Sequence, residues 1–225
     1  MASKLIVIEG LDGSGKATQS ELVCSYLKAQ GYKTDKLTFP DYNEKTSALV
    51  KMYLSGELGA DANAVNAYAA SSFYSVDRVA SYIKTWKTVY ENSEFIIADR
   101  YTTSNIIYQM SKLDTAEYDD FIDWLYDLEY NKLLLPKPDL VIFLDVSPDV
   151  SQKLLLSRYQ GDEGKKDIHE KNFKYLLQCR SSAMYAIEKL DWDVINCSDD
   201  ISIRCKEDIC KDILEEIKSK LKIDL

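Results

Sequence analysis

The chain has 225 residues, of which 28 are basic and 37 are acidic, so its formal net charge is −9. A chain this acidic is a poor candidate for binding long nucleic acid, although a local basic pocket can still bind a small anion. Apolar residues make up 46% of the sequence, yet no segment reaches the roughly 20 apolar residues of a membrane span. We therefore expect a cytoplasmic globular protein with no membrane association.

The chain contains five cysteines and no pair with CxxC spacing. This pattern predicts neither a zinc site nor a disulfide framework. Free thiols are typical of a reducing compartment, which agrees with the expected cytoplasmic location.

Short apolar segments that alternate with helical segments predict an α/β fold. The segment 4–9 is rich in β-branched residues and ends at a glycine, as buried parallel strands do. Four further strands are predicted at 34–39, 95–98, 139–145 and 192–196. Apolar residues at helical spacing predict helices at 16–30, 61–91 and 203–222. This alternation predicts a single domain over residues 1–225, in which helices flank a five-stranded parallel sheet in three layers.

A glycine-rich loop lies between the first predicted strand and the first predicted helix. Its sequence, Gly10-Leu-Asp-Gly-Ser-Gly-Lys16, matches the GxxxxGK pattern of a P-loop in the context that the pattern requires. The glycines let backbone N–H groups converge on phosphate oxygens, and the lysine contacts the terminal phosphates. A purely structural turn is the alternative. The residues expected to bind ATP here are Gly10, Asp12, Gly13, Ser14, Gly15, Lys16, Ala17 and Thr18.

The residue after the P-loop lysine is Ala17, where the strict pattern has a hydroxyl that binds Mg²⁺. Thr18 follows, but it is rotated by about 100° around the helix. We therefore expect a carboxylate from another segment, or the phosphates and water, to hold the ion.

Two further patterns place polar side chains where a nucleotide could bind. Asp99 and Arg100 follow a strand's carboxyl end, where open α/β sheets bind ligands and an arginine can clasp a phosphate. Tyr74 and Arg78 are four residues apart, so they share one helix face and offer a ring and a forked donor to a pyrimidine. The alternatives are a strand-end ion pair, and a core aromatic with a surface arginine.

The segment Gln160–Lys166 has two glycines and mixed charge between helical segments. It predicts either a solvated surface loop or a mobile lid over a phosphate site. The lone His169 has no visible partner in the sequence, so we expect a surface residue rather than a catalytic base.

The order of these motifs resembles that of the thymidylate kinases, a branch of the P-loop nucleoside monophosphate kinases, along nearly the whole chain. The matching elements are IEGLDGSGKATQ (8–19), Phe39-Pro40, Tyr74-Ser-Val-Asp-Arg78, Asp99-Arg100-Tyr101, Ser104-Asn105, Tyr108, Arg158 and Asp167…Glu170. The P-loop and the DRY sequence are specific, whereas the aromatic-x-x-x-Arg element alone would be weak.

The resemblance implies roles for these residues. Tyr74 would stack on thymine, Arg78 would bond the base, and Tyr108 would crowd the 2′ position and so favour deoxyribose. The implied acceptor-binding residues are Asp12, Phe39, Pro40, Tyr74, Arg78, Arg100, Ser104, Asn105 and Tyr108. The implied catalytic residues are Asp12, Lys16, Arg100 and Arg158. Adenine would lie near Arg158 or Arg180 and the turn at 196–198.

The chain departs from the family pattern at two places. Many members have an arginine just after Phe-Pro, where this chain has Asp41 and Tyr42, so one contact to the acceptor phosphate is missing or comes from Lys45. Gly13 stands where some members have a catalytic arginine. Family logic then places that cation in the lid, at about 157–170, where Arg158 precedes Lys165 and Lys166.

We therefore expect a kinase that transfers the γ-phosphate of ATP to dTMP with Mg²⁺. The candidate metal ligands are Asp12, Asp99 and Glu170. A deoxynucleoside kinase is one alternative, because the basic contact after Phe39-Pro40 is weak. A catalytically inactive nucleotide-binding protein is another, suggested by Ala17 alone. The resemblance also implies a homodimer, for which the region 61–91 offers apolar residues.

Overall fold

The computed structural model describes residues 3–158, 167–170, 172–199 and 202–223. Its centre is a parallel sheet with the strand order β2-β3-β1-β4-β5. The strands are β1 (Lys4–Gly10), β2 (Thr34–Thr38), β3 (Phe95–Asp99), β4 (Leu140–Asp145) and β5 (Asp193–Asn196). The five predicted strands are confirmed, each to within one residue at either end.

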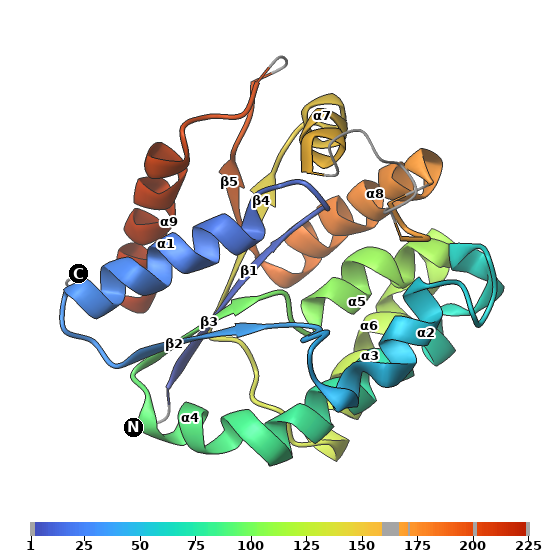
Figure 1. Cartoon of the computed structure of the whole chain (residues 1–225), viewed down its shortest axis with the longest axis horizontal. Coiled ribbons are helices and arrows are strands. Elements are labelled where there is room, and N and C mark those ends of the chain that lie inside the picture. Colours follow the sequence, from blue (N-terminus) through green and yellow to red (C-terminus); the bar gives the residue numbers. More distant parts are fainter. Residues whose placement is uncertain (1–2, 159–166, 171, 200–201, 224–225) are drawn as a thin grey trace.

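Helices cover both faces of the sheet, which confirms the three-layer architecture (Figure 1). The helices are α1 (Lys16–Ala29), α2 (Ala48–Leu54), α3 (Ala67–Ser81), α4 (Lys87–Asn92), α5 (Thr103–Tyr108), α6 (Tyr118–Tyr126), α7 (Pro148–Arg158), α8 (Phe173–Leu190) and α9 (Lys206–Leu221). Short 3₁₀ turns lie at Lys45–Ser47, Ala62–Ala64, Met110–Lys112 and Thr115–Glu117, and π-helical segments at Tyr82–Trp86 and Asp127–Lys132. Helices α1 and α9 lie together on one face, while α3 to α6 and α8 lie on the other (Figure 1).

The central strand β1 is buried on both faces. Leu5, Ile6, Val7 and Ile8 have no exposed surface. Because side chains alternate along a strand, Ile6 and Ile8 pack toward α1 and α9, while Leu5 and Val7 pack against the opposite layer. Fully burying each of these side chains stabilises the fold by about 1.5–3 kcal/mol. Burial on both faces explains why the segment is apolar throughout rather than alternating.

The single helical region expected at 61–91 is interrupted, so that prediction is wrong in detail. The continuous helix α3 begins at Ala67, because the Asn66 side chain accepts a hydrogen bond from Ala69 N at 2.8 Å and caps it. The π-helical segment Tyr82–Trp86 then separates α3 from α4. Neither a cap nor one widened turn disturbs the apolar spacing enough to be seen in the sequence.

The C-terminal helix α9 begins at Lys206, three residues later than predicted. Its apolar positions Ile209, Ile213 and Ile217 are buried in the core beside β1. The five cysteines are free thiols, as predicted. Within the described ranges, we find no helix with the length and apolar composition needed to cross a membrane.

Candidate active site

The glycine-rich loop turns tightly between β1 and α1, with Gly13 at φ 82° and Gly15 at φ 86°. These left-handed conformations favour glycine. The Lys16 side chain folds back over the loop, and its Nζ donates to Leu11 O at 2.7 Å. Ser14 Oγ is buried and, in the described part of the chain, has no hydrogen-bond partner. A buried hydroxyl and a buried ammonium at a helix N-terminus form a site suited to an anion.

The loop lines one side of a cavity of about 490 Å³. Its wall includes the predicted ATP-binding residues Asp12, Gly13, Ser14, Gly15, Lys16, Ala17 and Thr18, together with Asp99, Arg100, Leu154, Leu155, Ile203, Arg204 and Lys206. We call this hollow the loop cavity. It has the mixture of apolar walls and converging polar groups that is typical of cofactor and nucleotide sites.

The structure does not place every predicted ATP contact in this wall. Arg180 lies outside it, because its guanidinium forms an ion pair with Asp145 at 2.8 Å. Gly10 also lies outside the wall, although it shapes the loop. Instead, Ile203 and Arg204 line the cavity, on the segment that leads into α9. The side chain of Arg158 and residues Gln160–Lys166 lie outside the described residues.

Helix α7 packs directly on the loop, and this contact explains the glycine at position 13. A Cβ on Gly13 would lie 2.8 Å from Ser151 O and 3.1 Å from Leu155 Cγ. Ser151 Oγ also donates a hydrogen bond to Asp12 O at 2.5 Å. The arginine that some family members carry at this position therefore has no room in this arrangement.

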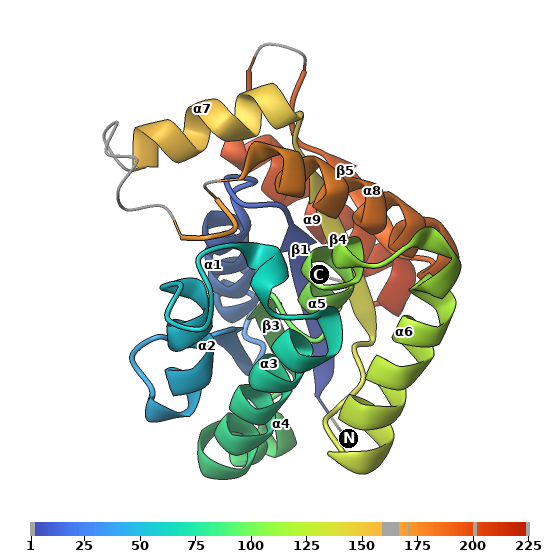
Figure 2. The same ribbon diagram turned by 90° about the vertical axis from the view of Figure 1, so that its right-hand side faces the viewer.

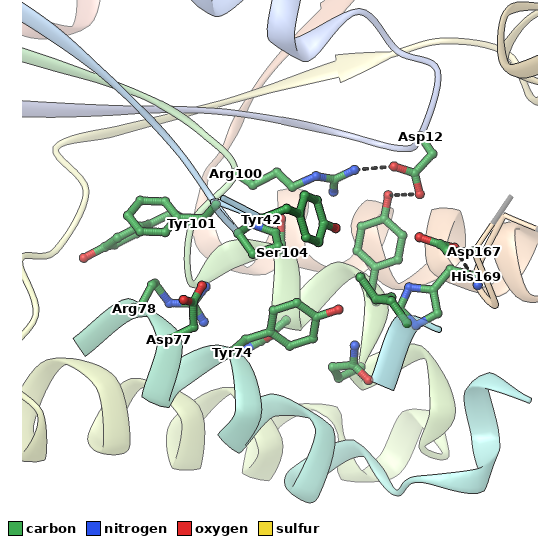
Figure 3. A pocket seen from close by; sticks show the side chains of 16 residues that line it. Asp12, Tyr42, Tyr74, Asp77, Arg78, Arg100, Tyr101, Ser104, Asp167 and His169 are labelled. Carbon is green, nitrogen blue, oxygen red and sulfur yellow. Dashed lines mark hydrogen bonds and ion pairs between the residues drawn. The ribbon is translucent and has the colours of Figure 1, made fainter. Parts of the chain in front are cut away.

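A second cavity adjoins the first, since Asp12 and Arg100 line both. Figure 3 shows the side chains that line this second cavity. We call it the aromatic cavity, because tyrosines from several elements line it. All nine predicted acceptor-binding residues lie in its wall: Asp12, Phe39, Pro40, Tyr74, Arg78, Arg100, Ser104, Asn105 and Tyr108. They come from α3 and α5 and from the segments that follow β1, β2 and β3. The fold therefore brings these residues, which are far apart in the sequence, into one cavity wall.

Asp12 and Arg100 form an ion pair at the boundary between the two cavities, and both residues line both of them. Tyr108 OH donates to the other Asp12 oxygen at 3.1 Å, and the Arg100 guanidinium lies over the Tyr108 ring at 5.1 Å. Arg100 adopts φ 67°, a strained value for a residue with a side chain and one found often at functional sites. Arg100 thus pairs with Asp12 rather than with its neighbour Asp99.

These contacts shift the proton affinities of the groups. Burial raises the pKa of Asp12, but Arg100 and Lys16 more than compensate and leave it below its usual value. Burial together with Arg100 lowers the pKa of Lys16 to about 8, although Asp12 and Asp99 oppose the shift. Perturbed pKa values that come from burial and from specific charged neighbours, as at Asp12 and Lys16, are often found at functional sites.

Glu9 is a buried site residue that the sequence did not reveal. It has no exposed surface and accepts hydrogen bonds from Thr103 Oγ1 at 2.7 Å, Ser104 Oγ at 2.8 Å and Tyr101 N at 3.2 Å. Burial raises the pKa of Glu9, while Arg100 lowers it in part. Ser104, a predicted acceptor contact, is therefore engaged by Glu9, which fixes the start of α5 against the loop.

The prediction that His169 is a surface residue is wrong. It is 5% exposed, lines the aromatic cavity and stacks on the Tyr108 ring with 5.6 Å between centroids. Its Nε2 lies 2.9 Å from Tyr53 OH. Burial lowers the pKa of His169 to about 3, so the ring is neutral. The sequence showed no partner because Tyr53 and Tyr108 are far from it along the chain.

Arg78 is buried, which rules out the surface-arginine alternative. Both it and Tyr74 line the aromatic cavity (Figure 3). Its guanidinium is held by Glu129, another residue that the sequence did not single out. Asp41 and Tyr42 occupy the positions after Phe39-Pro40 where many family members have an arginine. Of these two residues, only Tyr42 lines the aromatic cavity, and Lys45 does not line it either.

The candidate metal ligands do not form a preformed protein site. Among the described residues, no group of three or more histidine, cysteine or acidic side chains is arranged to hold a metal ion. Asp12 and Asp99 line the loop cavity beside Lys16, whereas Glu170 lines neither cavity. Mg²⁺ usually takes one or two carboxylates and fills its shell with phosphates and water. Asp12 and Asp99 fit an ion of that kind that arrives with a nucleotide.

Comparison with known proteins agrees with this geometry. A family model described as thymidylate kinase matches residues 8–208. The chain belongs to the thymidylate kinase family. It is 33% identical to a thymidylate kinase of Mycobacterium tuberculosis over 184 residues, which cover 81% of this chain and 84% of the relative. It is 24% identical to that of Danio rerio over 93% of this chain and 87% of the relative.

A solved thymidylate kinase from Candida albicans has the same fold, with a TM-score of 0.68 and 21% identity over 98% of this chain and 93% of that one. Membership of the thymidylate kinase family confirms the resemblance that the order of motifs indicated.

Proposed function

We propose that the chain transfers the γ-phosphate of ATP to dTMP and releases dTDP and ADP. The observation that supports this most is the meeting of two cavities at one ion pair. The P-loop lines one cavity, and the other contains the ring and forked donor suited to thymine, Tyr74 and Arg78. The Asp12–Arg100 pair at their boundary lies where the two phosphate chains would meet.

The residues of the chain would act by positioning and by neutralising charge, because phosphoryl transfer passes through a loose, in-line transition state. Lys16 and the loop N–H groups would hold the donor phosphates, and Arg100 would clasp the acceptor phosphate. Tyr108, packed over Arg100, would lie against the deoxyribose. Bound phosphates would favour the charged form of Lys16, whose pKa burial lowers to about 8 in the free protein.

Mg²⁺ bound with ATP would neutralise the charge that spreads over the transferred group. Asp12 and Asp99 are the residues that we propose to hold it, with Glu170 as a further candidate. Some family members carry a catalytic arginine at position 13, where this chain has no room for a side chain. We also propose that Arg158, at the start of a lid over about 157–170, supplies the positive charge in its place. A lid would exclude water and prevent ATP hydrolysis. We further propose that the chain folds as a single domain, forms a homodimer and is located in the cytoplasm.

The competing functions differ in their acceptor. A deoxynucleoside kinase takes an uncharged acceptor, so the absence of an arginine at Asp41 would matter less. Tyr42 and Arg100 both line the aromatic cavity, and the side chain of each can donate a hydrogen bond to a phosphate. This arrangement favours a phosphorylated acceptor. The inactive-protein alternative has less support, because the residues of both cavities are present and come together.

The decisive experiment is coupled ADP release from ATP–Mg²⁺ with dTMP, thymidine, dUMP, dCMP and dGMP offered separately. We expect strong turnover with dTMP and weaker turnover with dUMP. Turnover with thymidine but not dTMP would assign the protein to the nucleoside kinases. In a matched experiment, Lys16→Ala should lower kcat by orders of magnitude while circular dichroism shows an intact fold; normal turnover would exclude the P-loop as the donor site.

A further inference from the structure

Glu129 is a completely buried carboxylate behind the aromatic cavity. It accepts hydrogen bonds from Arg78 Nε at 2.8 Å, Arg78 Nη2 at 2.6 Å, Ser75 Oγ at 2.8 Å and Thr102 Oγ1 at 2.9 Å. Three of these donor atoms belong to Arg78 and Ser75 on α3, and the fourth belongs to Thr102 in the turn before α5. The carboxylate is therefore satisfied on both oxygens, as a buried charge must be.

The backbone places Glu129 there by an unusual turn. Glu129 lies within the π-helical segment Asp127–Lys132 that continues α6. The two ends of that segment are exposed, since the side chains of Asp127 and Lys132 retain 50% and 69% of their accessible surface, whereas Glu129 and Tyr130 between them are buried. Glu129 has none. Single π-helical turns are rare and occur often at functional sites, and here the turn directs one acidic side chain at α3.

The Arg78 guanidinium is fixed by more than the ion pair. Its Cζ lies 5.8 Å from the centroid of the Tyr101 ring, and Tyr101 itself is anchored by a hydrogen bond to Pro136 O at 3.0 Å. Within the described ranges, Nη1 donates to no protein atom, although Arg78 lines the aromatic cavity. Burial alone would lower the pKa of Arg78, but the Glu129 carboxylate raises it above its usual value, so the group stays charged.

Given the dTMP kinase activity proposed above, we propose that Glu129 is a positioning residue for the acceptor base. It acts through Arg78, whose Nε and Nη2 it occupies, so that the remaining Nη1 edge is presented to the cavity as a hydrogen-bond donor. A fixed donor at this edge suits a base with a carbonyl oxygen there, as thymine and uracil have. Cytosine carries an amino group at that position, so two donors would face each other and the base would be rejected.

Glu129→Gln is the sharpest test, because the amide keeps the shape but cannot accept both arginine hydrogen bonds. We expect KM for dTMP to rise about tenfold or more, with kcat within about threefold of the wild type and KM for ATP unchanged. We also expect the preference for dTMP over dCMP to fall. Asp127→Asn is the matched control, since it makes the same chemical change in the same π-helical segment without contacting Arg78; it should change neither constant.

A double-mutant cycle separates a role through Arg78 from a general structural one. If Glu129 acts through Arg78, the Arg78→Gln, Glu129→Gln double variant should have the same KM for dTMP as Arg78→Gln alone. Additive effects would overturn the proposal, as would a folded Glu129→Gln protein with normal KM and base preference. Glu129→Asp keeps the charge but shortens the side chain, so it serves if the amide fails to fold, and it should raise KM in the same way. Wild-type protein that turns over no dTMP would contradict the proposed function instead, and calorimetric binding of dTMP would still report on Glu129.

Discussion

Asp77 is the least satisfied charged group beside the aromatic cavity. It is 2% exposed, and in the described part of the chain its Oδ1 has no hydrogen-bond partner. Burial raises the pKa of Asp77, while Thr46 and Arg78 oppose the shift. A buried polar atom without a partner costs about 1–3 kcal/mol. The carboxylate therefore lowers stability near neutral pH.

We expect Asp77→Asn to raise the free energy of unfolding at pH 7 by about 1 kcal/mol. The pKa of Asp77 is higher in the folded state than in the unfolded state, so the folded protein binds more protons and its stability falls as pH rises above about 4. Asparagine does not titrate, so the stability of the variant lacks this contribution to its pH dependence. The difference should thus be largest at neutral pH and vanish below about pH 4, in urea unfolding at several pH values. A variant less stable than the wild type at pH 7 would show instead that Arg78 requires the Asp77 charge.

At the scale of single residues, the sequence revealed the site residues that belong to short-range patterns. The P-loop lies within seven consecutive residues, and Tyr74 and Arg78 share one helix face by spacing alone. Glu129 and His169 were missed because their contacts are not local: 51 residues separate Glu129 from Arg78, and 116 separate His169 from Tyr53. No periodicity encodes such pairs, and one sequence holds no record of which residues vary together.

Helix α7 and the P-loop approach each other closely at Gly13. In Figure 2, α7 lies across the end of the molecule that contains the carboxyl ends of the strands. Gly13 faces Ser151 and Leu155 with no space for a side chain. The position of α7, and with it the beginning of the proposed lid, is therefore coupled to the shape of the glycine-rich loop.

We expect Gly13→Ala to weaken ATP binding at least about tenfold, because the new methyl group would push α7 away or distort the loop. The left-handed φ alone adds a strain of about 1–2 kcal/mol. Gly31→Ala is the control: Gly31 has φ 93°, but a Cβ there would meet nothing within 4 Å. It should lower the melting temperature while leaving the ATP dissociation constant, measured by calorimetry, unchanged. Equal effects of both variants on ATP binding would show that strain rather than the α7 contact matters.

At the scale of whole elements, the sequence predicted the limits of a strand or helix best where burial alone determined the apolar pattern. Uniform burial makes β1 a continuous apolar segment, so its limits were clear. The breaks around α3 depend on the Asn66 cap and on one π-helical turn, and these involve single hydrogen bonds that the apolar pattern does not record.

At the scale of the whole molecule, apolar side chains remain exposed on α3 and the π-helical segment that follows it. Val76 is 50% exposed and Ile83 is 73% exposed, and both lie in the region expected to pair two subunits. Exposed apolar groups that gather on one face often mark an interface. Two copies related by a twofold axis could bury them together.

We expect light scattering on a sizing column to give a mass of about 51 kDa, twice the 25.7 kDa of one chain. Replacing exposed Ile83 with lysine should shift the protein toward the monomer, because a charge at the centre of an apolar interface is costly to bury. Lys87→Glu, on the exposed part of α4, is a control that should leave the mass unchanged. A wild-type monomer at micromolar concentration would remove the homodimer from the proposal.

The ion pair between Asp12 and Arg100 has a consequence for ligand design. It is the shared boundary of the two cavities, so a compound that joins a purine half to a thymine half must pass over it. Once one half of such a compound is bound, the second half is held near its own cavity at an effective concentration of about millimolar. The linker between them would meet a guanidinium on one side and a carboxylate on the other, so a chain of anionic groups of the right length would gain from Arg100, whereas a flexible uncharged chain would leave the pair unused.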